Sequence, residues 1–172
     1  GKQDGWIARL DAAGKVLWEK TCGGSARDWL CAVTVVEGGM IAAGTTESKG
    51  AGERDGWILR LDETGAIVQD QAVGGAHDEI VHDMARAKDG TVILVGSQKD
   101  GLAAAWLAVV SAAGGTVETR RFDSRQAVFN SVAVTLDEGW AMAGEYLKGN
   151  SRYGDFWLLK LDQNRKGPPS EK

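Results

Sequence analysis

Short apolar runs, separated by polar turns that carry glycine, follow one another along this chain. Some runs alternate apolar and polar residues, others are apolar throughout, as residues 92–95 are, and none has a helical period. A run that is apolar at every position is typical of a strand covered on both faces of its sheet. The pattern therefore predicts an all-β protein made of short antiparallel strands.

One strand recurs four times at a nearly constant interval. The copies are residues 4–11, 55–62, 104–111 and 155–162, and their tryptophans are Trp6, Trp57, Trp106 and Trp157. The tryptophans lie 51, 49 and 51 residues apart, and two sets of glycines keep nearly the same step, namely Gly39, Gly90, Gly139 and Gly44, Gly96, Gly144. Self-similarity at such a period indicates a repeat architecture.

Each period is expected to hold four strands. A turn follows the tryptophan strand, and in it an Asp side chain caps the backbone while a Gly takes a positive φ. These structural positions are Asp11, Asp62 and Asp162 at the start of the turn and Gly14, Gly65 and Gly114 at its end. The third strands are predicted within 29–36, 80–87 and 128–136, and the fourth within 40–44, 92–96 and 141–144.

Four antiparallel strands in each unit, without a helix, predict a β-propeller-like array. The repeat domain covers residues 4–162, with repeats at 4–54, 55–103 and 104–154 and a terminal strand at 155–162. A polar tail follows at 163–172. Because propellers need about four blades to close, three repeats and one strand predict a part of a longer propeller, completion by oligomerisation, or a capped open stack. The lone strand 156–161 would suit exchange with a partner chain or pairing with the N-terminal strands.

The first repeat carries Asp-x-Trp-Ile-x-Arg-Leu-Asp-x-x-Gly-x-Val-x-Trp up to Trp18, then Gly23-Gly24 and residues 40–44. This pattern resembles the bacterial β-propeller repeat family and, more weakly, the blades of quinoprotein-type propellers. The resemblance implies a secreted or periplasmic bacterial protein and says little about activity. The third repeat departs from the pattern, with Ala104 and Ser111 in place of the two aspartates.

Several side chains are candidates for a site. The four repeated tryptophans are expected in the packing between blades, whereas Trp29 and Trp140 fall outside that regularity and are the weak candidates for an exposed binding face. His77 and His82 lie five positions apart and would point to opposite faces of a strand, which argues against a shared metal. The repeated aspartates are assigned to structural hydrogen bonds, since a catalytic acid is needed only once.

Composition and charge narrow the class of protein. The net charge is −4 with acids and bases interleaved, and the pair Arg120-Arg121 is no basic stripe, so a nucleic-acid partner is not expected. No apolar run has the length of a membrane span and no signal peptide is visible. Whether Cys22 and Cys31 pair is left open by the sequence.

No catalytic motif, phosphate loop or metal-ligand spacing occurs in the chain, so no catalytic residue, metal or cofactor is predicted. The favoured function is a non-catalytic interaction module that binds a protein or another macromolecule through its blade loops. A lectin-like sugar binder that uses Trp29 and Trp140 is one alternative, and part of a quinoprotein-type enzyme is the other.

Overall fold

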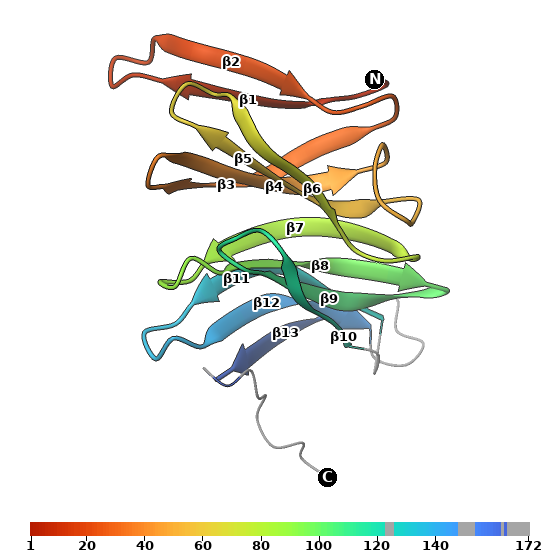
Figure 1. The fold of residues 1–172 in the computed structure, drawn as a ribbon. Coiled ribbons are helices and arrows are strands. Elements are labelled where there is room, and N and C mark those ends of the chain that lie inside the picture. The colour runs from red at the N-terminus through yellow and green to blue at the C-terminus, as the bar shows by residue number, and fades with distance from the viewer. Residues whose placement is uncertain (123–125, 148–153, 163, 165–172) are drawn as a thin grey trace. The chain divides into compact units, whose positions relative to one another are not determined.

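The computed structural model describes residues 1–122, 126–147, 154–162 and 164. These residues form thirteen strands and no helix (Figure 1). The strands are β1 (Gly5–Leu10), β2 (Val16–Cys22), β3 (Asp28–Val36), β4 (Gly39–Thr46), β5 (Asp55–Asp62), β6 (Ile67–Val73), β7 (Asp78–Arg86), β8 (Val92–Asp100), β9 (Leu102–Val110), β10 (Thr116–Phe122), β11 (Gln126–Val134), β12 (Trp140–Leu147) and β13 (Gly154–Leu161). Within the described residues there is accordingly no helix that could span a membrane.

The strands assemble into sheets whose neighbours follow one another in sequence. Two sheets have four strands, in the orders β3-β4-β5-β6 and β10-β9-β8-β7, one has three, β11-β12-β13, and one is the hairpin β1-β2. The registered pairs are antiparallel. The predicted all-β fold of four-stranded, blade-like sheets is therefore confirmed.

The sheets are out of phase with the sequence repeats by half a period. The sheet β3-β4-β5-β6 takes its first two strands from the repeat 4–54 and its last two from the repeat 55–103. The sequence reveals the interval of a repeat but leaves open which strands pair, because pairing depends on long-range backbone contacts.

The chain divides into two compact units, residues 1–81 and 82–172. In the first unit the hairpin β1-β2 lies against the sheet β3-β4-β5-β6. Ile7 and Cys22 from the hairpin enter one apolar cluster with Trp57, Leu59 and Leu61 of β5. Burying such side chains stabilises a fold by about 1.5–3 kcal/mol each, so this contact holds the unit together.

The core of the second unit lies between strands β8 and β9 and the three-stranded sheet. Leu107 and Val109 of β9 share a cluster with Phe129 and Met142. The ring of Phe129 stacks on that of Trp157 with centroids 4.8 Å apart. Trp157 also meets the ring of Phe122 of β10 edge to face, with centroids 6.1 Å apart, so the tryptophan strand packs against the preceding sheet in this unit as it does in the first.

Two of the repeated glycines are required by close packing of the backbone. Gly44 and Gly144 lie opposite Leu30 and Phe129, beside a register shift in the neighbouring strand. A Cβ added to either glycine would come within 1.9 Å of a carbonyl oxygen, that of Trp29 or of Val128. Only glycine fits there, which explains why this position recurs in the repeat.

The terminal strand is not the lone strand that the sequence suggested. β13 pairs with β12 over its whole length, from Gly154 opposite Leu147 to Leu161 opposite Trp140. Its other edge has no partner among the described strands. The third repeat, 104–154, therefore supplies the neighbour of this strand through β12.

The turn aspartates bond to the backbone. Oδ1 of Asp11 accepts hydrogen bonds from the N–H groups of Ala13 and Lys15, both at 2.9 Å. Oδ1 of Asp62 accepts from the N–H groups of Thr64 and Ala66 at 2.8 and 3.0 Å. The glycines that end these turns and the next one, Gly14, Gly65 and Gly114, have φ angles of 80°, 81° and 96°.

Of the predicted tail 163–172, only Asn164 lies within the described residues.

Candidate functional site

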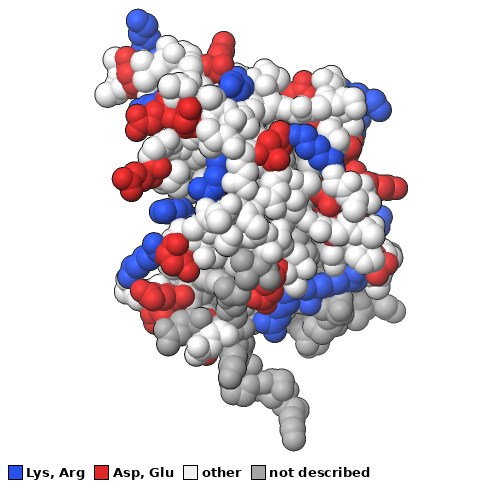
Figure 2. Space-filling view, in the orientation of Figure 1, with Lys and Arg blue, Asp and Glu red and all other residues white. Residues whose placement is uncertain are grey.

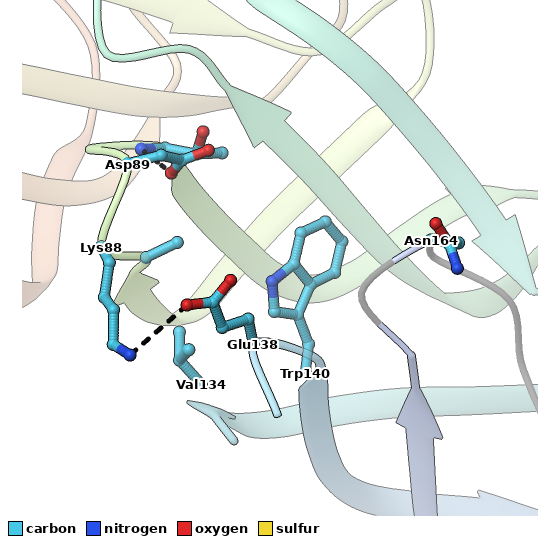
Figure 3. A pocket seen from close by; sticks show the side chains of 8 residues that line it. Lys88, Asp89, Val134, Glu138, Trp140 and Asn164 are labelled. Carbon is cyan, nitrogen blue, oxygen red and sulfur yellow. Dashed lines mark hydrogen bonds and ion pairs between the residues drawn. The ribbon is translucent and has the colours of Figure 1, made fainter. Parts of the chain in front are cut away.

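A polar cleft of about 440 Å³ opens in the second unit, where two turns lie next to each other (Figure 3). One wall comes from the turn between β7 and β8, the other from the turn between β11 and β12, and Asn164 lies beyond the end of β13. The cleft is lined by Ala87, Lys88, Asp89, Thr91, Val134, Glu138, Trp140 and Asn164. A cleft of this size can hold one side chain or a short segment of a ligand.

Opposite charges face each other at its mouth. Nζ of Lys88 lies 3.4 Å from Oε1 of Glu138, and both side chains are largely exposed (Figure 3). Oδ1 of Asp89 accepts a hydrogen bond from the N–H of Thr91 at 2.9 Å, which fixes the first turn. The exposed ion pair contributes little to stability, so both of its groups can exchange partners with a ligand.

The second turn is held in a strained conformation. Glu138 has a φ of 61°, and among the described residues other than glycine it alone has a positive φ. Its N–H donates to the carbonyl oxygen of Thr135 at 2.9 Å, and the N–H of Thr135 donates to the carbonyl oxygen of Gly139 at 2.8 Å. Such backbone strain occurs preferentially at ligand-binding positions.

Asp137 lies beside the cleft and carries a full negative charge. Hydrogen bonds from Nζ of Lys160 and from Oγ1 of Thr135, both at 2.5 Å, lower its pKa to about 2. Together with Glu138 and Asp162 it borders a smaller hollow next to Asn164. This end of the unit therefore presents three carboxylates, one amide and the ion pair between Lys160 and Asp137.

The two weak tryptophan candidates lie in different settings. Trp140 is only 6% exposed and belongs to the core of the second unit, so the prediction that it lies exposed on a binding face is corrected, although its indole lines the cleft. It is buried because it packs in one apolar cluster with Leu161, its partner in the register of β12 and β13, and with side chains of β8 and β9. Trp29, on β3, is half-buried and belongs to the first unit, whereas Trp140 belongs to the second.

The four repeated tryptophans are not equivalent. Trp57 and Trp106 are each 1% exposed, and Trp157 packs against the core of the second unit. Trp6 is 63% exposed, which corrects the prediction that all four are buried between blades. The reason is that the hairpin β1-β2 buries the opposite face, that of Ile7, and no described strand covers the face of Trp6.

Neither histidine belongs to a cluster of metal ligands. His77 precedes β7, whereas Nδ1 of His82 lies 3.2 Å from Oδ1 of Asn130. Among the described residues no three side chains of His, Cys, Asp or Glu are grouped so as to hold a metal ion. Cys22 is buried and Cys31 exposed, and the two do not form a disulfide.

Sequence reasoning missed two pairs of acids, one around Gly23 of Gly23-Gly24 and one around Gly74 of Gly74-Gly75. Carboxylate oxygens of Asp4 and Asp28 lie 2.7 and 2.8 Å from the place that a Cβ on Gly23 would occupy. Those of Asp55 and Glu79 lie 2.5 and 2.3 Å from the corresponding place on Gly74. The sequence held one sign that these acids belong together. In the third repeat both corresponding positions are alanine, namely Ala104 and Ala127.

Charged side chains of both signs are interspersed over the face drawn in Figure 2. No family model matches the chain, and no curated protein matches it either. The resemblance to bacterial propeller repeats therefore rests on the repeat pattern alone.

Proposed function

We propose that this protein is a non-catalytic interaction module and that the cleft at Lys88, Glu138 and Asn164 receives a polar segment of a protein partner. The single observation that supports this most is the pairing of two repeat turns around a cleft with both charges at its mouth. Turns on a rigid sheet scaffold are where binding residues are most often found.

The chemistry of the lining suits an extended peptide. Lys88 can bind a carboxylate, Glu138 can bind a cationic side chain, and the amide of Asn164 can bond to a peptide group. The indole of Trp140 and the side chain of Val134 supply an apolar floor. The exchange of the Lys88–Glu138 pair for ligand contacts favours segments that carry charges of both signs.

A test is to measure binding of the full chain to an array of peptides with systematically varied charge, followed by titration of the strongest ligand. Lys88→Ala and Glu138→Gln are expected to weaken binding by about tenfold each, since each removes one charged contact of roughly 1.4 kcal/mol. Lys15→Ala, in the exposed turn after β1, is the matched control. Equal affinity of all three variants and the unchanged protein would refute the assignment of the cleft.

A sugar ligand is the second candidate, because an indole, an amide and two carboxylates line the same cleft. Trp140 is only 6% exposed, however, which leaves little aromatic surface for stacking on a sugar ring. A glycan array distinguishes the two ligands: a glycan signal lost in Glu138→Gln, without any peptide signal, would favour the sugar.

A further inference from the structure

One face of the sheet β3-β4-β5-β6 in the first unit is only partly covered. The part on β5 lies under the hairpin β1-β2. On the edge strand β3, Val33 lies opposite Ala42 and Val35 opposite Met40, so both valines point to this same face. They are nevertheless 62% and 80% exposed.

In the second unit the same face is covered by neighbouring strands. Val132 and Val134 occupy the matching positions on β11, opposite Met142 and Trp140. Val132 is only 7% exposed, and both valines pack in a cluster that contains Ala85 of β7 and Ile93 of β8.

Hydrogen bonds also hold β7 against β11 at this face. Oδ2 of Asp83, on β7, accepts hydrogen bonds from Oγ of Ser131 and from the N–H of Val132 at 2.8 and 3.0 Å. In the second unit β7 and β8 therefore cover the face that is exposed at Val33 and Val35 in the first unit.

The position of the missing strands is marked by the open edge of β1. β5 pairs on one side with β4 and on the other with β6, and β9 pairs with β8 and β10, whereas among the described strands β1 pairs with β2 alone. A hairpin that paired with β1 in the way β4 pairs with β5 would complete a four-stranded sheet. Its strands would lie over Val33 and Val35, as β7 and β8 lie over Val132 and Val134.

We propose that a second copy of this chain fills this place with its β11-β12 hairpin, and that β12 of that copy pairs with β1 instead of with its own β13. The two competing strands are nearly the same, since residues 4–11 and 155–162 share the Asp-x-Trp pattern and the ending Leu-Asp. Gly44 lies opposite Trp57 and Gly144 opposite Trp157, so the same register places Gly144 opposite Trp6.

The exchange leaves the number of strand pairings unchanged, and Trp6 and Leu10 take the places beside β12 that Trp157 and Leu161 leave. The sheet β11-β12-β1-β2 has the strand order of the two complete sheets. Phe156 and Leu158 of β13, both largely exposed, are replaced by Gly5 and Ile7, which are buried against β5 in the first unit. The gain is the apolar area of Val33 and Val35 that leaves water. This proposal does not depend on the ligand of the cleft.

Disulfide trapping tests the pairing directly. Ala141 lies opposite Lys160 in the present sheet, and Arg9 has the place of Lys160 in its own strand. Arg9→Cys in one chain and Ala141→Cys in another, both with Cys31→Ala, are refolded together and oxidised. We expect a covalent pair at twice 18.3 kDa with a 9–141 disulfide identified by mass spectrometry. Arg9→Cys with Ala133→Cys, on the far strand β11, is the control and should not give this product.

Light scattering on the full chain supplies the second readout. Val35→Glu replaces an exposed side chain and should lower the association constant at least tenfold, whereas Leu136→Glu, in an equally exposed turn, should not change it. Val33→Lys serves as a second variant if Val35→Glu fails to fold. A monomer at all concentrations, equal association of Val35→Glu and the unchanged chain, or a 9–141 disulfide formed only within one chain carrying both cysteines would each overturn the proposal.

Discussion

The indole ring of Trp57 packs against Gly5, the residue next to the exposed Trp6. A Cβ on Gly5 would lie 3.2 Å from Cζ3 of Trp57 and 2.9 Å from Cγ of Leu30. The hairpin β1-β2 can approach the sheet beneath it because this position lacks a side chain. The contact links one repeat to the next inside the first unit.

Gly5→Ala is therefore expected to destabilise the first unit by about 1–3 kcal/mol, the usual cost of overpacking. Urea unfolding followed by tryptophan fluorescence measures the change. Gly75→Ala is the matched control, because a Cβ there would meet no atom within 4 Å. Equal destabilisation by both substitutions would show that the contact with Trp57 is not the cause.

The buried carboxylate of Asp28 should make the first unit sensitive to acid. Burial alone would raise its pKa, but hydrogen bonds from Oγ of Ser48, Oγ1 of Thr46 and the N–H of Gly24 outweigh burial and hold the pKa below its ordinary value. Since the folded pKa is the lower one, the stabilisation is present above the unfolded pKa of about 3.9 and is lost as the pH falls through the folded pKa.

The expected result is that the free energy of unfolding of the first unit falls as the pH is lowered below about 4. Asp28→Ala should cost about 1–3 kcal/mol at pH 7, because it leaves the buried hydroxyl of Thr46 and the half-buried hydroxyl of Ser48 without their acceptor. It should also flatten the acid part of the pH profile. A variant that retains the acid-dependent loss would assign that loss to another carboxylate.

Asp55 should behave in the opposite way. Burial raises its pKa, a hydrogen bond from the N–H of Gly52 partly opposes this, and the nearby carboxylate of Glu79 raises the pKa further. For a carboxyl with a raised folded pKa, the favourable contribution is full below the unfolded pKa and disappears as the pH rises through the folded one.

Asp55→Asn removes that ionisation, so the variant is expected to be more stable than the unchanged protein at pH 7 and equally stable near pH 3. Chemical denaturation at the two pH values measures the difference. Asp62→Asn is the contrasting variant, since hydrogen bonds from Thr64 and Ala66 lower the pKa of Asp62 and the variant should lose stability at pH 7. A change of the same sign in both variants would contradict this account.

The indole N–H of Trp57 donates to Oδ1 of Asp70 at 2.9 Å, whereas Nε1 of the buried Trp106 has no hydrogen-bond partner among the described residues. Leu59, two residues after Trp57, lies opposite Asp70 in the sheet. In the same way Ala108, two residues after Trp106, lies opposite Thr119. Thr119→Asp should therefore supply the acceptor and stabilise the second unit by about 1 kcal/mol. Thermal unfolding compared with Thr119→Val decides the point, and equal stability of the two variants would speak against it.

Glu138 has a strained backbone conformation, and its side chain lines the proposed binding cleft. Glu138→Gly relieves the positive φ and should raise the stability of the second unit by about 1 kcal/mol while it weakens peptide binding. Glu138→Ala should weaken binding equally without the gain in stability, because alanine keeps the strain. Melting temperature and peptide affinity, measured on both variants, separate the two effects, and a stable Glu138→Gly variant with full affinity would remove Glu138 from the site.

Much of the fold could be predicted because its signals are local. The alternation of apolar residues places the strands, and a turn such as Asp62–Gly65 needs only its own side chain and one glycine to form. The cleft could not be predicted, since the turns that carry Lys88 and Glu138 are fifty residues apart in the chain. Trp140 stood out only because it broke the repeat, and that irregularity did not reveal that it is buried.

The sequence by itself determined the strands, the turns and the interval of the repeat. Only the tertiary structure decided which copy of the strand is buried: the same Asp-Gly-Trp-Ile sequence leaves Trp6 63% exposed and Trp57 1% exposed. The strand conformation is set by local backbone and side-chain preferences, whereas burial requires a neighbouring sheet. Such a neighbour comes from a distant part of the chain or, as we propose for the first unit, from a second copy.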